Sequence, residues 1–122
     1  MENNYKQDFI KRLICFSLGI VKFCGKIRED RNLRPIADQI IRSATSIGAN
    51  IVEAKAASSK KDYLNYFQIA LKSANETKYW LVLLKESKSE FATQADKHLS
   101  EAIEITKIIS SGILTMKGHK KI

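Results

Sequence analysis

Apolar residues recur every three or four positions along most of this chain, which is the spacing of one face of an α-helix. The clearest run passes through Ala44, Ile47, Ile51 and Ala54. An earlier segment repeats this spacing at Phe9, Leu13, Phe16, Ile20, Phe23 and Ile27. The pattern lapses at three short stretches of charged or small polar residues. Four helices are therefore predicted, over about 4–27, 35–57, 60–87 and 94–117.

Residues typical of helix N-termini support these helices and leave only short connections between them. Pro35 suits the first turn of the second helix. Ser59 followed by Asp62 resembles a capping box in which Asp replaces the usual Glu or Gln, and Thr93 with Asp96 offers a similar start for the fourth helix. Short connections force consecutive helices to run antiparallel. The sequence predicts an all-α, antiparallel up-down-up-down four-helix bundle.

Polar residues share a second face of the helix over 35–57. Counting outward from the turn places Arg42 beside Glu76 on the following helix, so these two side chains are predicted to form an ion pair. Small neighbouring residues let another helix approach closely, which favours an enclosed network over an ordinary solvated face. The predicted structural network consists of Arg42, Ser46, Asn50, Glu53 and Glu76.

The remaining apolar patterns differ in width. The third helix has one stripe, which Lys78 interrupts, at Leu64, Phe67, Leu71, Ala74 and Leu81. The fourth helix carries Leu99, Ala102, Ile103, Ile109, Ile113 and Met116. The first and fourth helices also carry second stripes, at Ile10, Ile14, Leu18 and Val21 and at Ile105 and Ile108. One core face needs only about 100° of a helix, so this extra width predicts self-association rather than scattered exposed residues.

The middle of the chain also carries a family resemblance. Its residues are Arg42–Ala54, Ser59–Asp62, Ile69–Lys72 and Glu76–Leu81. They resemble a bacterial four-helix-bundle family that includes proteins encoded in intervening sequences of 23S ribosomal RNA genes, once labelled S23 ribosomal proteins, and the accessory protein of diversity-generating retroelements. The chain departs at Ala44 and Ala54, where branches of the family have glycine. The resemblance implies ring-shaped pentamers of four-helix subunits and specifies no chemistry.

Charge narrows the choice of partner. The 122 residues fit one domain, 1–122, and carry a formal charge of +8 with a pI near 9.6. This excess favours nucleic acid first and an anionic membrane second. We expect no membrane partner, because the apolar run of the first helix is too short and too charged at its edges to span a bilayer. The candidate nucleic-acid-binding residues are Lys6, Lys11, Arg12, Lys22, Lys26, Arg28, Arg31 and Arg34.

The first helix is predicted to be part of the mature fold rather than a secretory signal. Its apolar run reaches Val21, where Lys22 interrupts it, and no small-residue cleavage site follows.

Cys15 and Cys24 lie about 13 Å apart along one helix and cannot bridge each other. They are expected to be buried or half-buried thiols in a reducing cytoplasm.

The sequence gives little support for catalysis. It has no metal-binding motif, cofactor motif or recognisable nucleophile with its base, so catalytic, cofactor-binding and metal residues are predicted to be none. Asn50 with Glu53 could form a hidden active site, but these side chains serve equally well between helices. Two functions remain: an oligomer that binds structured RNA or an RNA–protein complex through phosphates, and a protein-interaction scaffold that docks on a nucleic-acid enzyme such as a reverse transcriptase.

Overall fold

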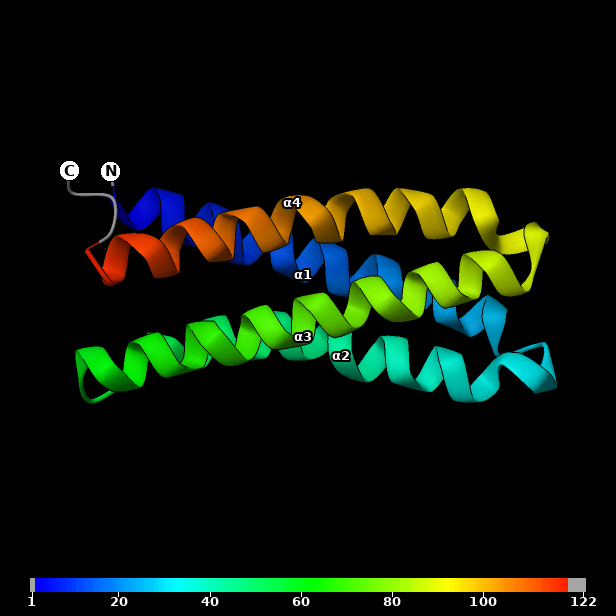
Figure 1. Ribbon diagram of the computed structural model, residues 1–122, viewed down its shortest axis with the longest axis horizontal. Helices are drawn as coiled ribbons and strands as arrows, with labels where there is room; N and C mark the ends of the chain where they lie inside the picture. The colour runs from blue at the N-terminus through cyan, green and yellow to red at the C-terminus, as the bar shows by residue number, and fades with distance from the viewer. Residues whose placement is uncertain (1, 119–122) are drawn as a thin grey trace.

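Four long helices run alternately up and down along one axis (Figure 1). The computed structural model describes the backbone of residues 2–118 and the side chains of residues 5–118. The four helices and the two short 3₁₀ helices that precede α2 and α4 are α1 (Glu2–Ile27), η1 (Arg31–Leu33), α2 (Arg34–Ala54), α3 (Lys60–Ser87), η2 (Ser89–Phe91) and α4 (Ala92–Met116). Residues 2–118 contain no strand. The predicted all-α, antiparallel four-helix bundle is confirmed.

The core lies along the predicted faces of α1 and α2. On α1, Phe9 is partly buried and the rest of the stripe from Leu13 to Ile27 is buried. On α2, Ala44, Ile47, Ile51 and Ala54 are all buried. Apolar residues repeating at three and four positions thus turn one face of each helix towards the core.

Two predicted stripes need correction. The buried face of α3 passes through Thr77 rather than through Lys78, because the steps of three and four that begin at Ala70 and Ala74 continue to Thr77, Leu81 and Leu84. On α4, Ile105 belongs to the core, whereas Ile103 is exposed.

Helix ends follow local hydrogen bonding and differ from the prediction in two places. Ser59 caps α3 as predicted, since its Oγ accepts a hydrogen bond of 3.0 Å from the backbone N–H of Asp62. However, α2 ends at Ala54 rather than near 57, because the next three backbone N–H groups bond to carbonyls three residues back. Thr93 does not cap α4, which already begins at Ala92 after η2.

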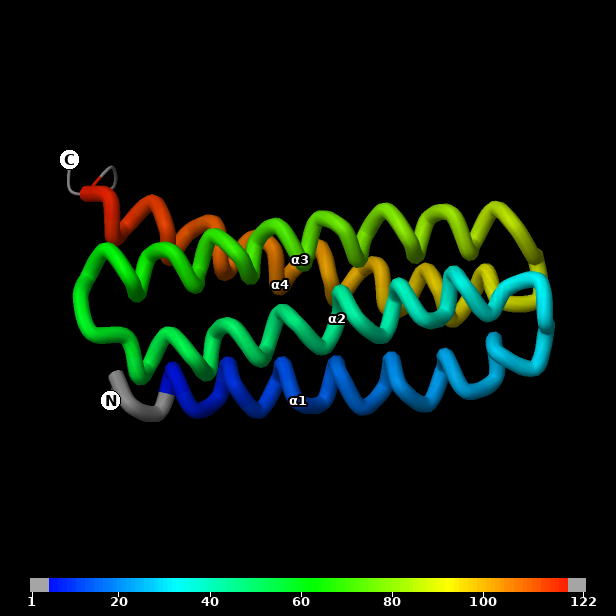
Figure 2. The backbone as a smooth tube through the Cα atoms, turned by 90° about the horizontal axis from the view of Figure 1, so that it is seen from below, coloured from blue at the N-terminus to red at the C-terminus, as the bar shows by residue number. Residues whose placement is uncertain are grey.

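The α1–α2 and α3–α4 connections meet at one end of the bundle, opposite the α2–α3 turn (Figure 2). There Lys88 Nζ donates a hydrogen bond of 2.8 Å to Asp30 Oδ2. The backbone N–H of Asn32 also donates to Asp30. The hydrogen bond from Lys88, followed by that from Asn32, holds the pKa of the Asp30 carboxyl below its usual range. This contact links both connections across the end of the bundle.

Candidate nucleic-acid interface

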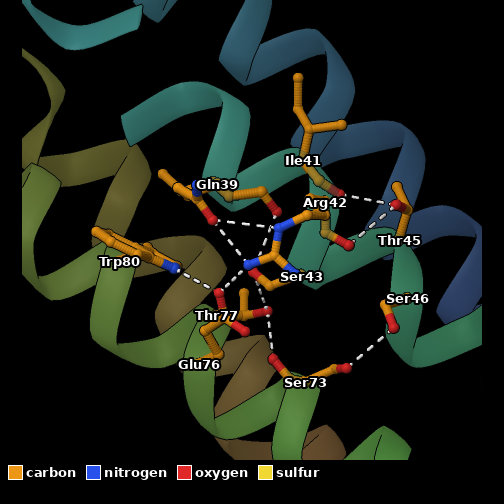
Figure 3. A network of polar contacts seen from close by, with 11 residues as sticks. Gln39, Ile41, Arg42, Ser43, Thr45, Ser46, Ser73, Glu76, Thr77 and Trp80 are labelled. Atoms are coloured by element: carbon orange, nitrogen blue, oxygen red, sulfur yellow. Dashed lines mark hydrogen bonds and ion pairs between the residues drawn. The ribbon is translucent and has the colours of Figure 1, made fainter. Parts of the chain in front are cut away.

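A ladder of hydroxyl groups joins α2 to α3 (Figure 3). Ser43 and Thr77 are completely buried, and their hydroxyl oxygens lie 2.9 Å apart. Thr77 Oγ1 also lies 2.8 Å from the backbone oxygen of Ser73. One step along, Ser46 Oγ lies 3.0 Å from Ser73 Oγ, and Asn50 Nδ2 donates to the Ser46 carbonyl at 2.8 Å. These short side chains let the two helices approach closely while leaving no buried side-chain polar atom unpaired in the described residues.

The predicted pair of Arg42 and Glu76 lies at the outer edge of this ladder. Arg42 Nη2 donates to Glu76 Oε2 and, at 2.7 Å, to Gln39 Oε1. Trp80 Nε1 donates to the same Glu76 oxygen at 2.9 Å. The Arg42 and Glu76 side chains are 59% and 36% exposed, so solvent screens their attraction. This pair therefore lies at the solvent-exposed edge of the contact between α2 and α3, and it is not enclosed as predicted.

The structure brings together only part of the predicted polar network. Arg42 meets Glu76, and Asn50 meets Ser46, but these are two separate groups. Glu53 is exposed on α2 and makes no hydrogen bond or ion pair with either group among the described side chains. The hydroxyls of Ser43, Ser73 and Thr77 were missed, because the counting that pairs Arg42 with Glu76 places Ser43 opposite Asn75 rather than opposite its observed partner Thr77. The ladder contains no side chain able to act as a base near neutral pH, so its geometry suits helix packing.

Ion pairs and hydrogen bonds divide the eight candidate phosphate-binding residues. Arg12 makes a bidentate contact with Glu101 of α4, at 2.6 and 2.7 Å, and these hydrogen bonds raise the pKa of its guanidinium. Arg28 pairs with Asp38. Arg34 Nε donates to the backbone oxygen of Arg28 at 2.8 Å. These three arginines thus contact other groups of the same chain.

The other five candidates remain available to a partner. Lys6 Nζ lies 6.0 Å from the ring centre of Tyr63, at the long end of the cation–π range. Four further side chains are exposed and belong to no ion pair among the described residues, namely Lys11, Lys22, Lys26 and Arg31. The structure therefore separates cations that brace the bundle from cations that face solvent.

An apolar row accompanies these lysines on α1. Ile14, Leu18 and Val21 are 53%, 56% and 47% exposed, as the predicted second stripe requires, whereas Ile10 of that stripe is partly buried against the core. Part of this row, with Leu13 and Gly48 beneath it, lines an open groove of about 480 Å³ between α1 and α2. On α4 the exposed apolar residues are Ile103, Ile108 and Leu114.

The cysteines and His98 differ in their surroundings. Cys24 is buried, and burial raises the pKa of its thiol to about 12. Cys15 is exposed, contrary to the prediction that both thiols are at least half-buried. His98 of α4 stacks on Phe23 at 5.1 Å, and burial, followed by the charge of Lys97, lowers the pKa of its imidazole. The described residues contain no cluster of three His, Cys, Asp or Glu side chains that could hold a metal ion.

Comparison with known families identifies the chain. Residues 5–111 match the sequence profile described as 23S rRNA-intervening sequence protein. The chain belongs to this family. The match to the intervening-sequence protein family thus spans most of the bundle, and the matched residues include the hydroxyl ladder and the exposed apolar row of α1.

A solved structure supports the assignment to the intervening-sequence protein family. It is the crystal structure of a protein with unknown function from the S23 ribosomal protein family of Bacteroides thetaiotaomicron VPI-5482. The two chains are 37% identical, with a TM-score of 0.81, and the similarity covers 86% of this chain and 97% of the other. No curated protein matches the chain. Within residues 2–118, no helix is long and apolar enough to cross a bilayer.

Proposed function

We propose that this protein is a non-enzymatic oligomer in the cytoplasm that binds structured RNA, or an RNA–protein complex, mainly through phosphate contacts. The observation that carries this proposal is the surplus of cations after ion pairing. Besides the five available candidates, exposed lysines without an ion-pair partner among the described residues are Lys55, Lys60, Lys61, Lys72, Lys97 and Lys117. Unpaired carboxylates in the same part of the chain are fewer, namely Asp8, Glu29, Glu53, Asp62 and Glu86. A surface of this kind attracts polyanions and carries little sequence information.

Self-association belongs to the same proposal. The exposed apolar rows of α1 and α4 are what a subunit interface would cover. An oligomer repeats its cations around a symmetry axis and so multiplies the field that one subunit presents to a nucleic acid. Five subunits is the number that the family resemblance favours.

The direct test uses the purified protein and a labelled, structured RNA in low salt. Fluorescence anisotropy should rise on titration, and size-exclusion chromatography with light scattering should give a mass well above the 13.8 kDa of one chain. Absence of RNA binding, with the oligomer intact, would contradict the nucleic-acid function.

A protein-interaction scaffold is the second candidate function, and the α1–α2 groove favours it. The groove is open, its walls are largely apolar, and it includes Ile10, Ile14, Leu18 and Val52. Such a groove can receive an apolar face of another protein. This second function would be supported over the first if the purified protein captured a nucleic-acid enzyme but did not itself bind RNA.

A further inference from the structure

The outward face of α1 carries three lysines in a row. Lys11, Lys22 and Lys26 are all exposed, and their spacings of eleven and four residues return to one side of an α-helix. The rise of a helix places Lys11 and Lys22 about 16 Å apart along the axis, and Lys22 and Lys26 about 6 Å apart. Packing of the opposite face of α1 into the core makes this row part of a rigid element.

The stretch of α1 between the three lysines is favourable to an anion, whereas exposed carboxylates lie beyond its two ends, at Asp8 one turn before Lys11 and at Glu29 three residues after Lys26. Residues 11–26 contain no Asp or Glu, so no carboxylate on this stretch of α1 neutralises the lysines. Beside the row, Lys97 of α4 lines the same surface hollow as Cys15 of α1. The carboxylates of that hollow, Glu101 and Glu104, already pair with Arg12 and Lys107.

The row also lacks a stacking platform. The only aromatic residues between Lys11 and Lys26 are Phe16 and Phe23, and both are buried in the core. Proteins that hold single-stranded nucleic acid combine a positive groove with exposed aromatic side chains on which bases stack. This face of α1 offers the charges without the rings.

From these observations we propose that the lysine row of α1 (Lys11, Lys22 and Lys26) binds the phosphates along one side of a double-helical nucleic acid. The inference rests on the proposed function and specifies the class of nucleic acid. A duplex holds its phosphates at fixed positions, so a rigid row of cations meets several of them without first ordering a flexible strand. Cys15, the side chain that lies among the lysines on this face, offers no hydrogen-bond pattern for reading bases, so binding is independent of sequence.

A matched control exists on α3. Lys61 and Lys72 have the same eleven-residue spacing as Lys11 and Lys22, and both are exposed. Their stretch of α3 contains Asp62, however, and Glu76 lies one turn beyond Lys72. Removing Lys61 and Lys72 changes the total charge by the same amount as removing Lys11 and Lys22, but leaves the row of α1 intact.

The experiment compares four labelled probes by anisotropy: a 20-base-pair RNA duplex, a DNA duplex of the same sequence, and one single strand of each. We expect duplexes to bind at least about 10-fold more tightly than single strands. At about 0.15 M salt, Lys11→Ala/Lys22→Ala should weaken duplex binding by about 25-fold, and Lys61→Ala/Lys72→Ala by less than about 3-fold. A preference for the RNA or the DNA duplex identifies the helical form that the row fits.

The contrary results separate this inference from the proposed function. Equal binding of single strands and duplexes overturns the duplex assignment, while nucleic-acid binding stands. Equal losses in the two double variants overturn the assignment to α1. If no probe binds in low salt, the proposed function fails and the lysine row has no nucleic-acid role. Circular dichroism of each variant establishes that a loss of binding is not a loss of helix.

Discussion

Single hydroxyl groups determine how α2 and α3 meet. Ser43 and Thr77 are buried polar residues surrounded by core side chains, and they are tolerated there because they bond to each other and to the backbone of α3. A hydroxyl has one proton, so Thr77 can satisfy both neighbours only by donating to one and accepting from the other. The pair therefore acts as a unit.

This unit predicts a non-additive response to mutation. Thr77→Val keeps the shape of the side chain but leaves the buried Ser43 hydroxyl with only its long contact of 3.4 Å to the Ile40 carbonyl, so it should destabilise the fold by about 1–3 kcal/mol. Ser43→Ala in the Thr77→Val background should then cost less than Ser43→Ala alone. Urea unfolding of the two single variants and the double variant measures the coupling. Strict additivity would show that the two hydroxyls are independent.

The Arg42 pair should respond weakly. Arg42→Ala removes a contact that is largely exposed, and Glu76 keeps its hydrogen bond from Trp80. The expected loss is below about 1 kcal/mol, compared with the 1–4 kcal/mol that an enclosed pair would give. A loss above about 2 kcal/mol in thermal or urea unfolding would mean that solvent does not screen this pair.

His98 makes stability depend on pH. Its imidazole has a lowered pKa in the folded protein, so the unfolded chain binds the proton more readily. Stability is therefore full above the unfolded pKa of about 6.5 and falls as the pH drops through that value towards the folded pKa. The urea midpoint should decrease from pH 7.5 to pH 5, and His98→Gln should flatten this dependence. An unchanged slope in His98→Gln would assign it to other groups.

At the scale of the helices, the sequence predicts which face of a helix is buried better than it predicts where the helix begins and ends. The buried faces of α1 and α2 follow directly from three- and four-residue spacing. The buried face of α3 was predicted to pass through Lys78 instead of Thr77, because Thr77 has a polar side chain. Its hydroxyl is satisfied in the core by Ser43, which is 34 residues away in the sequence. The start of α4 was misplaced because buried Phe91, which packs 5.9 Å from Phe23, leads directly into the helix without a polar cap. Tertiary contacts of this kind override local signals.

The exposed row of α1 yields the prediction for assembly. Leu18→Glu places a charge in the middle of this row and should reduce the oligomer to a monomer of about 14 kDa by light scattering, with helix content unchanged. Val82→Glu, at an exposed valine of α3, is the control and should leave the mass unaltered. A wild-type protein that is already monomeric at micromolar concentration would contradict self-association.

At the scale of the whole molecule, net charge was available from the sequence but its pairing was not. Arg12 and Glu101 are 89 residues apart, so only the fold reveals that this arginine braces α1 against α4. A variant that changes both Lys11 and Arg12 to Ala would therefore be a poor probe of binding, since it would also remove a bidentate contact between helices. The exposure of the lysines of α1, by contrast, follows from the core face that the apolar spacing of that helix predicts.

The central claim is that the surplus cations bind phosphates, and its most direct measurement is the salt dependence of binding. Each contact that neutralises a phosphate releases a counterion, so log affinity should fall with log salt by about 0.7 to 0.9 per contact. For the wild-type protein and a structured RNA, we predict a total slope steeper than about −3, with weak dependence on sequence. No measurable binding in low salt, or a slope near zero, would contradict the nucleic-acid account and leave the scaffold function in its place.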